Sequence, residues 1–339
     1  MFVKEIYAYD DVVLVPQYSD IRSRSEIDLS IKLNEKITLS LPIISSPMST
    51  ITETNMANAM NELGGLGIIH RYNTIDYQRK LLSYVKENKA AAIGITGDYK
   101  ERLSALVDEG LEIVCLDVAH GDHIMMEECI QFVKETYPHL YIIAGNVATA
   151  DGFERLVNAG AHAIRVSIGS GSICTTRIQT GHGIPTLQAL IDCNERRKIL
   201  RSDVLLIADG GIKNSGDIVK SLAAGADLVI LGSLLSGTYE SPGRVFRKDG
   251  KSFKKYAGMA SKEAQLKGRG YYNSIEGVST IVRFKGNVSK TIEELQTNIK
   301  SGLSYSGARN IKELQEVAIF VKQTTSSHGE GLPHILTRV

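Results

Sequence analysis

Residues 204–233 read VLLIADGGIKNSGDIVKSLAAGADLVILGS, and this stretch contains the repeating unit that decides the fold. An apolar run, VLLIA, ends at the polar turn DGG, and a second apolar run, ADLVIL, ends at GS. The helical pattern between the two runs stops at the glycine of LAAG, which is a common way for a helix to end. Near-continuous apolar runs are typical of parallel strands that are covered by helices. The stretch therefore predicts a strand, a helix and a second, parallel strand.

The same unit recurs along most of the chain. Eight apolar runs of this kind begin at Pro42, Gly65, Ala90, Ile113, Leu140, Ala161, Val204 and Ala226. Eight strand–helix units within about 200 residues predict an α/β fold of the TIM (β/α)8 barrel type, with residues 1–339 forming one domain. A doubly wound sheet is the alternative, but it would want an early G-x-G-x-x-G turn after the first strand, and that turn is absent.

The composition and charge of the chain limit the partners and the cellular compartment that we expect. The 339 residues are 43% hydrophobic and 23% charged, as in a globular protein, and the formal net charge is only +1. This charge gives no reason to expect nucleic acid or an anionic membrane as a partner. No apolar run reaches the roughly 18 residues that span a bilayer. Acidic residues occupy the place of a signal peptide's apolar core in MFVKEIYAYDDVV, so we expect a cytoplasmic protein.

One of the four cysteines stands in an unusual context. None of Cys115, Cys129, Cys174 and Cys193 belongs to a C-x-x-C pair, so a zinc site is not expected. Cys174 alone lies in a glycine-rich loop, SIGSGSICTTR at residues 167–177, where the backbone can approach a ligand closely. From the residues alone, this cysteine is either a passive core thiol or a nucleophile.

The ends of the predicted strands carry the candidate ligand-binding residues. Functional side chains of a TIM barrel gather at the carboxyl ends of its strands, and phosphate is commonly bound after strands seven and eight. Here the glycine-rich ends GSGSICTTR, ADGG and LGS follow strands six, seven and eight. Backbone amides and hydroxyls of Ser172, Gly211, Gly232 and Ser233 are therefore candidates for binding a phosphate, and Asp209 is a candidate for accepting hydrogen bonds from ribose hydroxyls.

The segment after the barrel predicts an appendage. Residues 244–256, RVFRKDGKSFKKY, predict a β-hairpin that turns at DG. Residues 260–279 lack a strong helical period and predict a mobile flap. Residues 291–308 and 310–323 predict two closing helices.

These motifs together resemble the IMP dehydrogenase and GMP reductase family. The likeness rests on GSGSICTTR, ADGG, LGS, AGNVAT and the series YAGM…EG…FKG, and it extends over residues 10–308. Dehydrogenases of the family usually carry inserted CBS modules, but residues 74–89 run directly into the third strand and leave no room for them.

The flap favours the reductase branch of the family. Only sixteen residues separate Gly258-Met259 from Glu276-Gly277, and they lack the adjacent Arg-Tyr pair with which the dehydrogenases activate water; the nearest candidates are Arg269 and Tyr271. The stretches SSPM and HRYN and the tail SSHGEGLPH instead look dehydrogenase-like. An IMP dehydrogenase without CBS modules, oxidising IMP to XMP with NAD, therefore stays the alternative.

The resemblance implies a covalent reaction at Cys174. A thiolate can add to C2 of a purine, and oriented amides of the loop would favour the anion. In the reductase, Cys174 attacks C2 of GMP, ammonia leaves, and hydride from NADPH reduces the thioimidate to give IMP. The family implies that Thr176 and Glu276 relay the proton that ammonia needs.

The resemblance also implies the two halves of a binding cleft. On the nucleotide side it adds Gly210, Tyr256, Gly258, Met259 and Gly277 to the residues named above. On the cofactor side it implies Ser23, Arg24, Asp117, Val118, Ala119, Asn146 and Gly169, with Asn146 bracing the cysteine loop. It implies a monovalent cation, K⁺, on the carbonyls of Gly169, Gly171 and Cys174, and a homotetramer.

Some positions depart from the family pattern, and other functions remain to be weighed. Arg71 stands where lysine is common, and Ser167 and Ser170 replace a glycine and a proline. A class I aldolase is a rival on the same barrel, but it needs a lysine in a strand, and none of the eight runs contains one. A nucleotide-binding barrel without activity is the non-enzyme rival; the intact Cys174, Thr176 and Glu276 speak against it.

Overall fold

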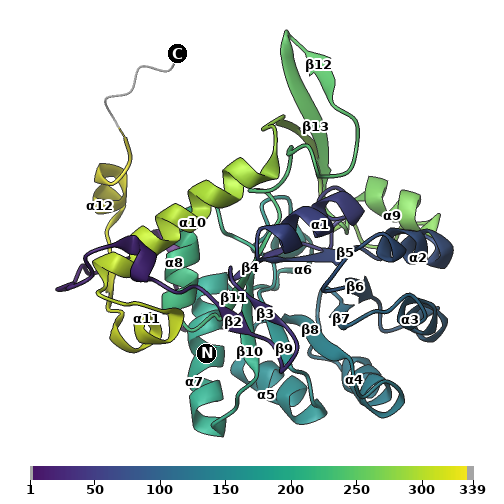
Figure 1. The fold of residues 1–339 in the computed structure, drawn as a ribbon, viewed down its shortest axis with the longest axis horizontal. Coiled ribbons are helices and arrows are strands. Elements are labelled where there is room, and N and C mark those ends of the chain that lie inside the picture. Colours follow the sequence, from purple (N-terminus) through teal and green to yellow (C-terminus); the bar gives the residue numbers. More distant parts are fainter. Residues whose placement is uncertain (1–2, 334–339) are drawn as a thin grey trace.

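A closed barrel of eight parallel strands forms the centre of the molecule (Figure 1). The computed structural model describes residues 3–333, apart from the side chains of Lys267 and Arg269. The barrel strands are β4 (Ile43–Ser45), β5 (Leu66–Ile69), β6 (Ala90–Ile93), β7 (Ile113–Asp117), β8 (Tyr141–Val147), β9 (Ala163–Val166), β10 (Leu205–Asp209) and β11 (Leu228–Leu231). The barrel closes where β11 pairs with β4 in parallel, with Val229 opposite Ile43. All eight predicted strands and the TIM barrel are thereby confirmed.

Helices surround the barrel as the periodic pattern predicts. They are α1 (Thr54–Glu62), α2 (Ile75–Ser83), α3 (Tyr99–Val107), α4 (Ile124–Thr136), α5 (Ala150–Ala159), α7 (Thr186–Leu200), α8 (Ser215–Ala223) and α10 (Val288–Tyr305). Side chains before several of these helices satisfy their free backbone amides: Thr149 accepts a hydrogen bond from the amide of Gly152, and Asn214 from that of Asp217. Residues 84–89 join α2 to β6 directly, so no CBS-sized insertion interrupts the barrel.

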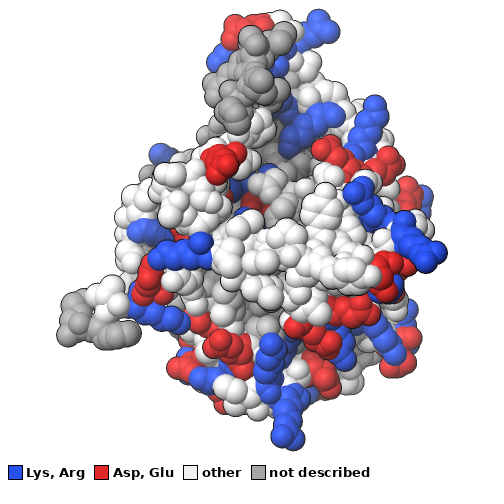
Figure 2. Space-filling model, turned by 90° about the vertical axis from the view of Figure 1, so that its left-hand side faces the viewer, with Lys and Arg blue, Asp and Glu red and all other residues white. Residues whose placement is uncertain are grey.

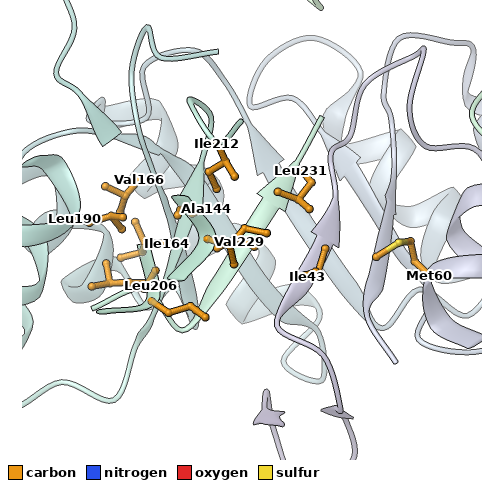
Figure 3. Close-up of a cluster of buried hydrophobic side chains, with 14 of the residues drawn as sticks. Ile43, Met60, Ala144, Ile164, Val166, Leu190, Leu206, Ile212, Val229 and Leu231 are labelled. Atoms are coloured by element: carbon orange, nitrogen blue, oxygen red, sulfur yellow. The ribbon is translucent and has the colours of Figure 1, made fainter. Parts of the chain in front are cut away.

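Alternation along the strands divides the core into two layers. Outward-facing residues such as Ile43, Val229 and Leu231 pack against the helices, together with Met60 of α1 and Leu190 of α7 (Figure 3). Side chains of the other parity form a separate buried cluster within the barrel, joined by residues of β3 (Thr38–Leu39), which pairs with β2 (Ile31–Lys32). These short apolar strands are thus buried on both faces.

The β5–α1 contact shows why one glycine is needed. A Cβ atom on Gly67 would lie 2.4 Å from the Cα of Ala57 in α1, which is far inside van der Waals contact. Glycine at this position lets the helix lie directly on the strand.

The predicted hairpin is present and has a third strand. Strands β12 (Phe246–Lys248) and β13 (Lys251–Ala257) pair in antiparallel fashion and project beyond the barrel (Figure 1). They turn at Asp249 and Gly250, whose φ angles of 50° and 72° suit the Asp-Gly turn. Strand β14 (Ser279–Arg283) pairs with the other edge of β13 and so returns the chain to the barrel.

Two details after the barrel differ from the sequence prediction. The flap contains a helix, α9 (Lys262–Arg269), which Ser261 caps by accepting a hydrogen bond from the amide of Ala264. The second closing helix, α11 (Ile311–Val317), stops short of the predicted end. The following residues form β15 (Phe320–Lys322), since the N-terminal strand β1 (Val12–Leu14) offers a partner there.

The surface beside these terminal elements mixes both signs of charge. Figure 2 shows a broad uncharged area on this side, bordered by interspersed acidic and basic side chains. None of the helices within residues 3–333 combines the length and the apolar character that crossing a bilayer requires.

Candidate active site

A cavity of about 460 Å³ opens at the carboxyl ends of the barrel strands. The strand ends, the cysteine loop at residues 167–177 and the flap all contribute to its lining. Of the site residues named from the sequence, all but two line this cavity. The two are Ser23 and Arg24, which lie at the short turn η2 (Arg24–Glu26) beside α10. Their role toward a cofactor stays a prediction.

The cysteine loop is held in shape by its own hydroxyl groups. The amide of Cys174 donates to the carbonyl of Gly171 at 3.0 Å. Thr186 donates a hydrogen bond to Ser167 at 3.0 Å, and Ser170 donates to the carbonyl of Ile184 at 3.3 Å. The two serines that depart from the family pattern therefore anchor the loop at its base and its middle.

Cys174 is the partly exposed thiol among the four cysteines. Burial raises the pKa of Cys115 to about 11 and the pKa values of Cys129 and Cys193 to about 12, so these three stay protonated and shielded. Cys174 lines the cavity instead. Its position leaves it as the candidate nucleophile.

A chain of hydrogen bonds links this thiol to the flap. The Sγ atom of Cys174 lies 3.2 Å from Oγ1 of Thr176, and the Thr176 hydroxyl donates to Oε2 of Glu276 at 2.8 Å. The backbones are paired as well: the amide of Thr175 donates to the carbonyl of Glu276 at 2.8 Å, and Val278 donates to Ile173 at 3.0 Å. Loop and flap thus form one unit around the cysteine.

The glycine-rich ends of strands six to eight meet at the other side of the cavity. A Cβ on Gly210 would lie 3.3 Å from the amide nitrogen of Gly171, and one on Gly232 would lie 3.2 Å from the hydroxyl of Tyr256. That hydroxyl is 3.3 Å from Oγ of Ser172. Burial raises the pKa of Tyr256, which keeps the hydroxyl protonated and able to donate a hydrogen bond.

A largely buried arginine that the sequence analysis did not single out lines the floor of the cavity. Arg165 on β9 is 5% exposed and forms ion pairs with Asp117 and Asp209, at 2.6 Å and 2.7 Å. Arg71 donates to the other oxygen of Asp117 at 3.2 Å, which gives this unusual residue a partner. The available signal was a charged residue inside an otherwise apolar strand run, AHAIRVSI.

The role expected for Asn146 needs correction. Its side-chain amide donates to Oδ2 of Asp209 at 2.8 Å, so this group braces the carboxylate rather than the cysteine loop. The strand end of β8 points it toward β10, where Asp209 lies.

The Asp117 carboxylate is ionised despite its burial. Burial alone would raise the pKa of Asp117, but the charges of Arg165 and Arg71 outweigh burial and lower it below the ordinary value. The cavity floor therefore carries fixed charges of both signs. Within residues 3–333, no three His, Cys, Asp or Glu side chains are grouped as metal ligands would be.

Comparison with known proteins agrees with the fold. Residues 6–334 match the family model described as IMP dehydrogenase / GMP reductase domain. The chain is 32% identical to the inosine-5'-monophosphate dehydrogenase of Nitrosopumilus maritimus, over 98% of this chain and 99% of that protein. It is 34% identical to the enzyme of the same name from Borreliella burgdorferi, over 98% and 97%.

A solved structure matches equally well along its length. The crystal structure of a GMP reductase from Trypanosoma brucei in complex with guanosine 5'-monophosphate superposes with a TM-score of 0.92 at 27% identity, covering 99% of each chain. The family model, the named relatives and the shared barrel together place this chain in the IMP dehydrogenase/GMP reductase family of purine nucleotide oxidoreductases.

Proposed function

We propose that this enzyme is a GMP reductase, which converts GMP to IMP and ammonia with NADPH. The observation that carries the proposal is the composition of the flap over Cys174. Its described side chains that line the cavity beyond Ala260 are those of Gln265, Asn273, Ser274 and Glu276, and only Glu276 among them is ionisable. A reductase needs a proton donor there, whereas a dehydrogenase needs a base to activate water.

The two residues that could activate water in an IMP dehydrogenase, Arg269 and Tyr271, give that function no support. The side chain of Tyr271 is 59% exposed and does not line the cavity. The side chain of Arg269 lies outside the part of the chain that the structure describes. Gln265 is occupied within the flap, since its amide donates to the carbonyls of Ala260 and Ser274 at 3.1 Å and 2.9 Å.

The proposed reaction balances at each step. Sγ of Cys174 bonds to C2 of GMP, and the bond from C2 to the exocyclic nitrogen breaks. Ammonia leaves with a proton that Thr176 and Glu276 deliver, because an amide anion is too poor a leaving group. When bound, NADPH supplies the hydride that C2 accepts. The C2–S bond then breaks, which releases IMP and returns the thiolate.

Fixed groups of the cavity would bind the remainder of the nucleotide. The amides and hydroxyls at Ser172, Gly211, Gly232 and Ser233, with the Tyr256 hydroxyl, would hold the phosphate. Asp209 would accept from the ribose, and Gly258, Met259 and Gly277 would contact the base. Asp117, Val118, Ala119, Asn146 and Gly169 would face the nicotinamide half of the cofactor.

A K⁺ ion on the carbonyls of the cysteine loop and a homotetramer remain parts of the proposal. The carbonyl of Gly171 already accepts from the amide of Cys174, so a cation would share that oxygen. Activity in K⁺ compared with Na⁺ buffers, and molar mass by light scattering, test the two parts separately.

IMP dehydrogenase activity is the second candidate, because the curated relatives carry that name. The two reactions are separated by supplying purified enzyme with GMP plus NADPH, and with IMP plus NAD. We expect NADPH oxidation with one ammonia released per turnover, and little XMP. Robust XMP formation would reject the reductase.

Two variants sharpen this assay. Glu276→Gln should slow the release of ammonia from GMP by at least roughly a hundredfold, the scale of one acid–base group. Tyr271→Phe should leave the rate of GMP reduction unchanged. If the enzyme instead oxidises IMP, and Tyr271→Phe abolishes that oxidation, Tyr271 is the base of a dehydrogenase.

A further inference from the structure

The side chain of Arg165 touches both halves of the proposed cleft. Its Nη1 donates to Oδ1 of Asp117 at 2.6 Å, while Nη2 and Nε donate to Oδ2 of Asp209 at 2.7 Å and 3.0 Å. Asp117 ends β7 and Asp209 ends β10, and β9 carries Arg165 between them in the barrel order. One planar cation therefore spans the floor from the cofactor side to the nucleotide side.

The contacts leave one oxygen of Asp209 for a ligand. Oδ2 accepts three hydrogen bonds, two from Arg165 and one from Asn146 at 2.8 Å. Oδ1 accepts none from the described residues, and Asp209 lines the cavity. The fork of Arg165 thus turns the carboxylate so that Oδ1 is the acceptor offered to a hydroxyl group in the cavity.

The same fork holds Asp117 in place. Oδ1 of Asp117 is bound by Arg165 and Oδ2 by Arg71, so neither oxygen is free to rotate away. Arg165 itself is 5% exposed and lines the floor of the cavity, with Nη1 also 3.3 Å from the thiol of Cys115. A guanidinium can form this double bridge because its donors are fixed in one plane, whereas a lysine ammonium acts as a single point.

We propose that Arg165 is a positioning residue that orients Asp209 toward the nucleotide ribose and Asp117 toward the cofactor, and so couples the two binding halves. This inference rests on the proposed assignment of those halves. Arg165 acts through the two carboxylates and does not itself react.

A positioning role for Arg165 is distinguished from a purely structural role by measuring how strongly the enzyme prefers GMP over 2'-deoxy-GMP. If Arg165 presents Oδ1 of Asp209 to the ribose 2'-hydroxyl, wild-type enzyme binds GMP more tightly than 2'-deoxy-GMP. In Arg165→Lys, we expect GMP affinity to fall on the order of tenfold, as for loss of a charged hydrogen bond, while 2'-deoxy-GMP affinity changes much less. The preference for ribose should therefore largely disappear.

The experiment measures binding by calorimetry with GMP, IMP and 2'-deoxy-GMP, without turnover. Arg197→Lys is the matched control, since Arg197 forms a comparable partly buried ion pair with Asp227 at residues away from the cavity. It should keep the wild-type preference for ribose. Because binding requires no reaction, this test stands whether the enzyme reduces GMP or oxidises IMP.

A double variant tests the route through Asp209. Asp209→Asn should lose the preference on its own, and adding Arg165→Lys to it should cost little further GMP affinity, since coupled residues are not additive. If Arg165→Lys does not fold, Arg165→Met with Asp117→Asn removes one cation and one anion together and tests the same loss of selectivity.

Two results would overturn the proposed role of Arg165 toward the ribose, and a third would overturn the coupling. One is a folded Arg165 variant that keeps the full wild-type preference for GMP over 2'-deoxy-GMP. The other is wild-type enzyme that binds the two nucleotides equally, because Asp209 would then accept no hydrogen bond from the ribose 2'-hydroxyl. Weaker binding of NADPH in Arg165→Lys, measured separately, would support the coupling, and unchanged NADPH affinity would confine Arg165 to the nucleotide side and reject the coupling.

Discussion

Cys174 differs from the other three cysteines in its surroundings rather than in its chemistry. The thiols of Cys115, Cys129 and Cys193 are buried, and burial raises their pKa values to about 11 or 12. Cys174 lies between a hydroxyl and a cavity. The glycine-rich loop sequence was sufficient to single it out, because such loops expose their residues to ligands.

Replacement of the nucleophile tests the covalent step. Cys174→Ser should abolish turnover, because a serine hydroxyl at neutral pH is a far weaker nucleophile than a thiolate. GMP affinity should stay within a few fold, since the phosphate and ribose contacts lie elsewhere. Steady-state kinetics and calorimetry give both numbers, and Cys193→Ala serves as the control. Turnover near the wild-type rate in Cys174→Ser would exclude the covalent mechanism.

His162 couples stability to pH at the opposite end of the barrel. Its Nδ1 accepts a hydrogen bond from the amide of Ile142 at 2.9 Å, and its ring stacks on Tyr141 at 5.0 Å. Partial burial, and then the charge of Lys134, lower the pKa of His162. The accepting nitrogen must be unprotonated, so the folded state favours the neutral ring.

The sign of this coupling gives a measurable pH dependence. With a folded pKa below the unfolded value of about 6.5, the contribution of His162 is fully present above that pH and is lost as the pH falls below it. Urea unfolding between pH 8 and pH 5 should show the wild-type protein losing stability relative to His162→Gln. The same substitution at the exposed His139 is the control. A stability difference that stays constant across this range contradicts the prediction.

Single residues also mark the limit of reading the sequence alone. A charged residue within an apolar strand run, as at Arg165, signals a buried partner, but the partners on β7 and β10 are 48 and 44 residues away. For the same reason, the sequence did not reveal that the side chain of Asn146 donates to Asp209. Which side chains meet at a barrel end depends on strand register, which local pattern does not specify.

Two lysines, one on β13 and one just after β14, bind the segment that follows β11. Lys254 of β13 is 2% exposed, and its ammonium donates to the carbonyls of Thr238 and Ser241. Lys285 donates to the carbonyls of Ser233 and Leu234 at 3.0 Å and 2.9 Å. The segment they hold begins with the cavity residue Ser233, so the hairpin supports one wall of the site.

Loss of the buried ammonium should loosen this connection. Lys254→Met keeps most of the side-chain volume but leaves buried carbonyls without a donor, at a cost of about 1–3 kcal/mol in the free energy of unfolding. Lys255→Met, one residue further along the same strand, removes an exposed lysine and should change stability by less than about 0.5 kcal/mol. Chemical denaturation measures both. Equal effects of the two substitutions would show that the buried contacts contribute nothing specific.

Local pattern predicted the elements whose residues are periodic and missed those that depend on a partner. The hairpin follows from its Asp-Gly turn, and α10 follows from a long apolar face. Phe320–Lys322 instead becomes strand β15 because β1 lies beside it, a contact between segments more than 300 residues apart. The flap helix α9 is short and polar, so its cap at Ser261 was its main signal.

At the scale of the molecule, closure of the barrel brings the glycine-rich ends of β9, β10 and β11 to one place. These strands are neighbours in the barrel order, so the fold itself gathers the three ends where we propose that phosphate binds. The barrel itself could be predicted in full, because the same strand–helix pattern recurs eight times in the sequence. The angle of the hairpin above it was not, since no repeat encodes it.

A pair of substitutions at Gly211 tests the phosphate position. Gly211 has a φ of +78°, and a Cβ there would lie 3.4 Å from Cβ of Ser170, so alanine and aspartate share the same backbone strain. Gly211→Asp adds a negative charge and should bind GMP at least roughly tenfold more weakly than Gly211→Ala. Guanosine, which lacks the phosphate, should bind the two variants alike. Equal GMP affinity in both variants would move the phosphate elsewhere.

The pairing of β1 with β15 also sets an order of events during synthesis. Phe320–Lys322 is made roughly 300 residues after Val12–Leu14, so at about 5–20 residues per second β1 waits on the order of 15–60 s for its partner. Throughout that interval the edge of β1 has none of the backbone partners that β15 later supplies. Until β15 is made, β1 therefore presents unpaired backbone groups, which are the kind of groups that pair with other chains.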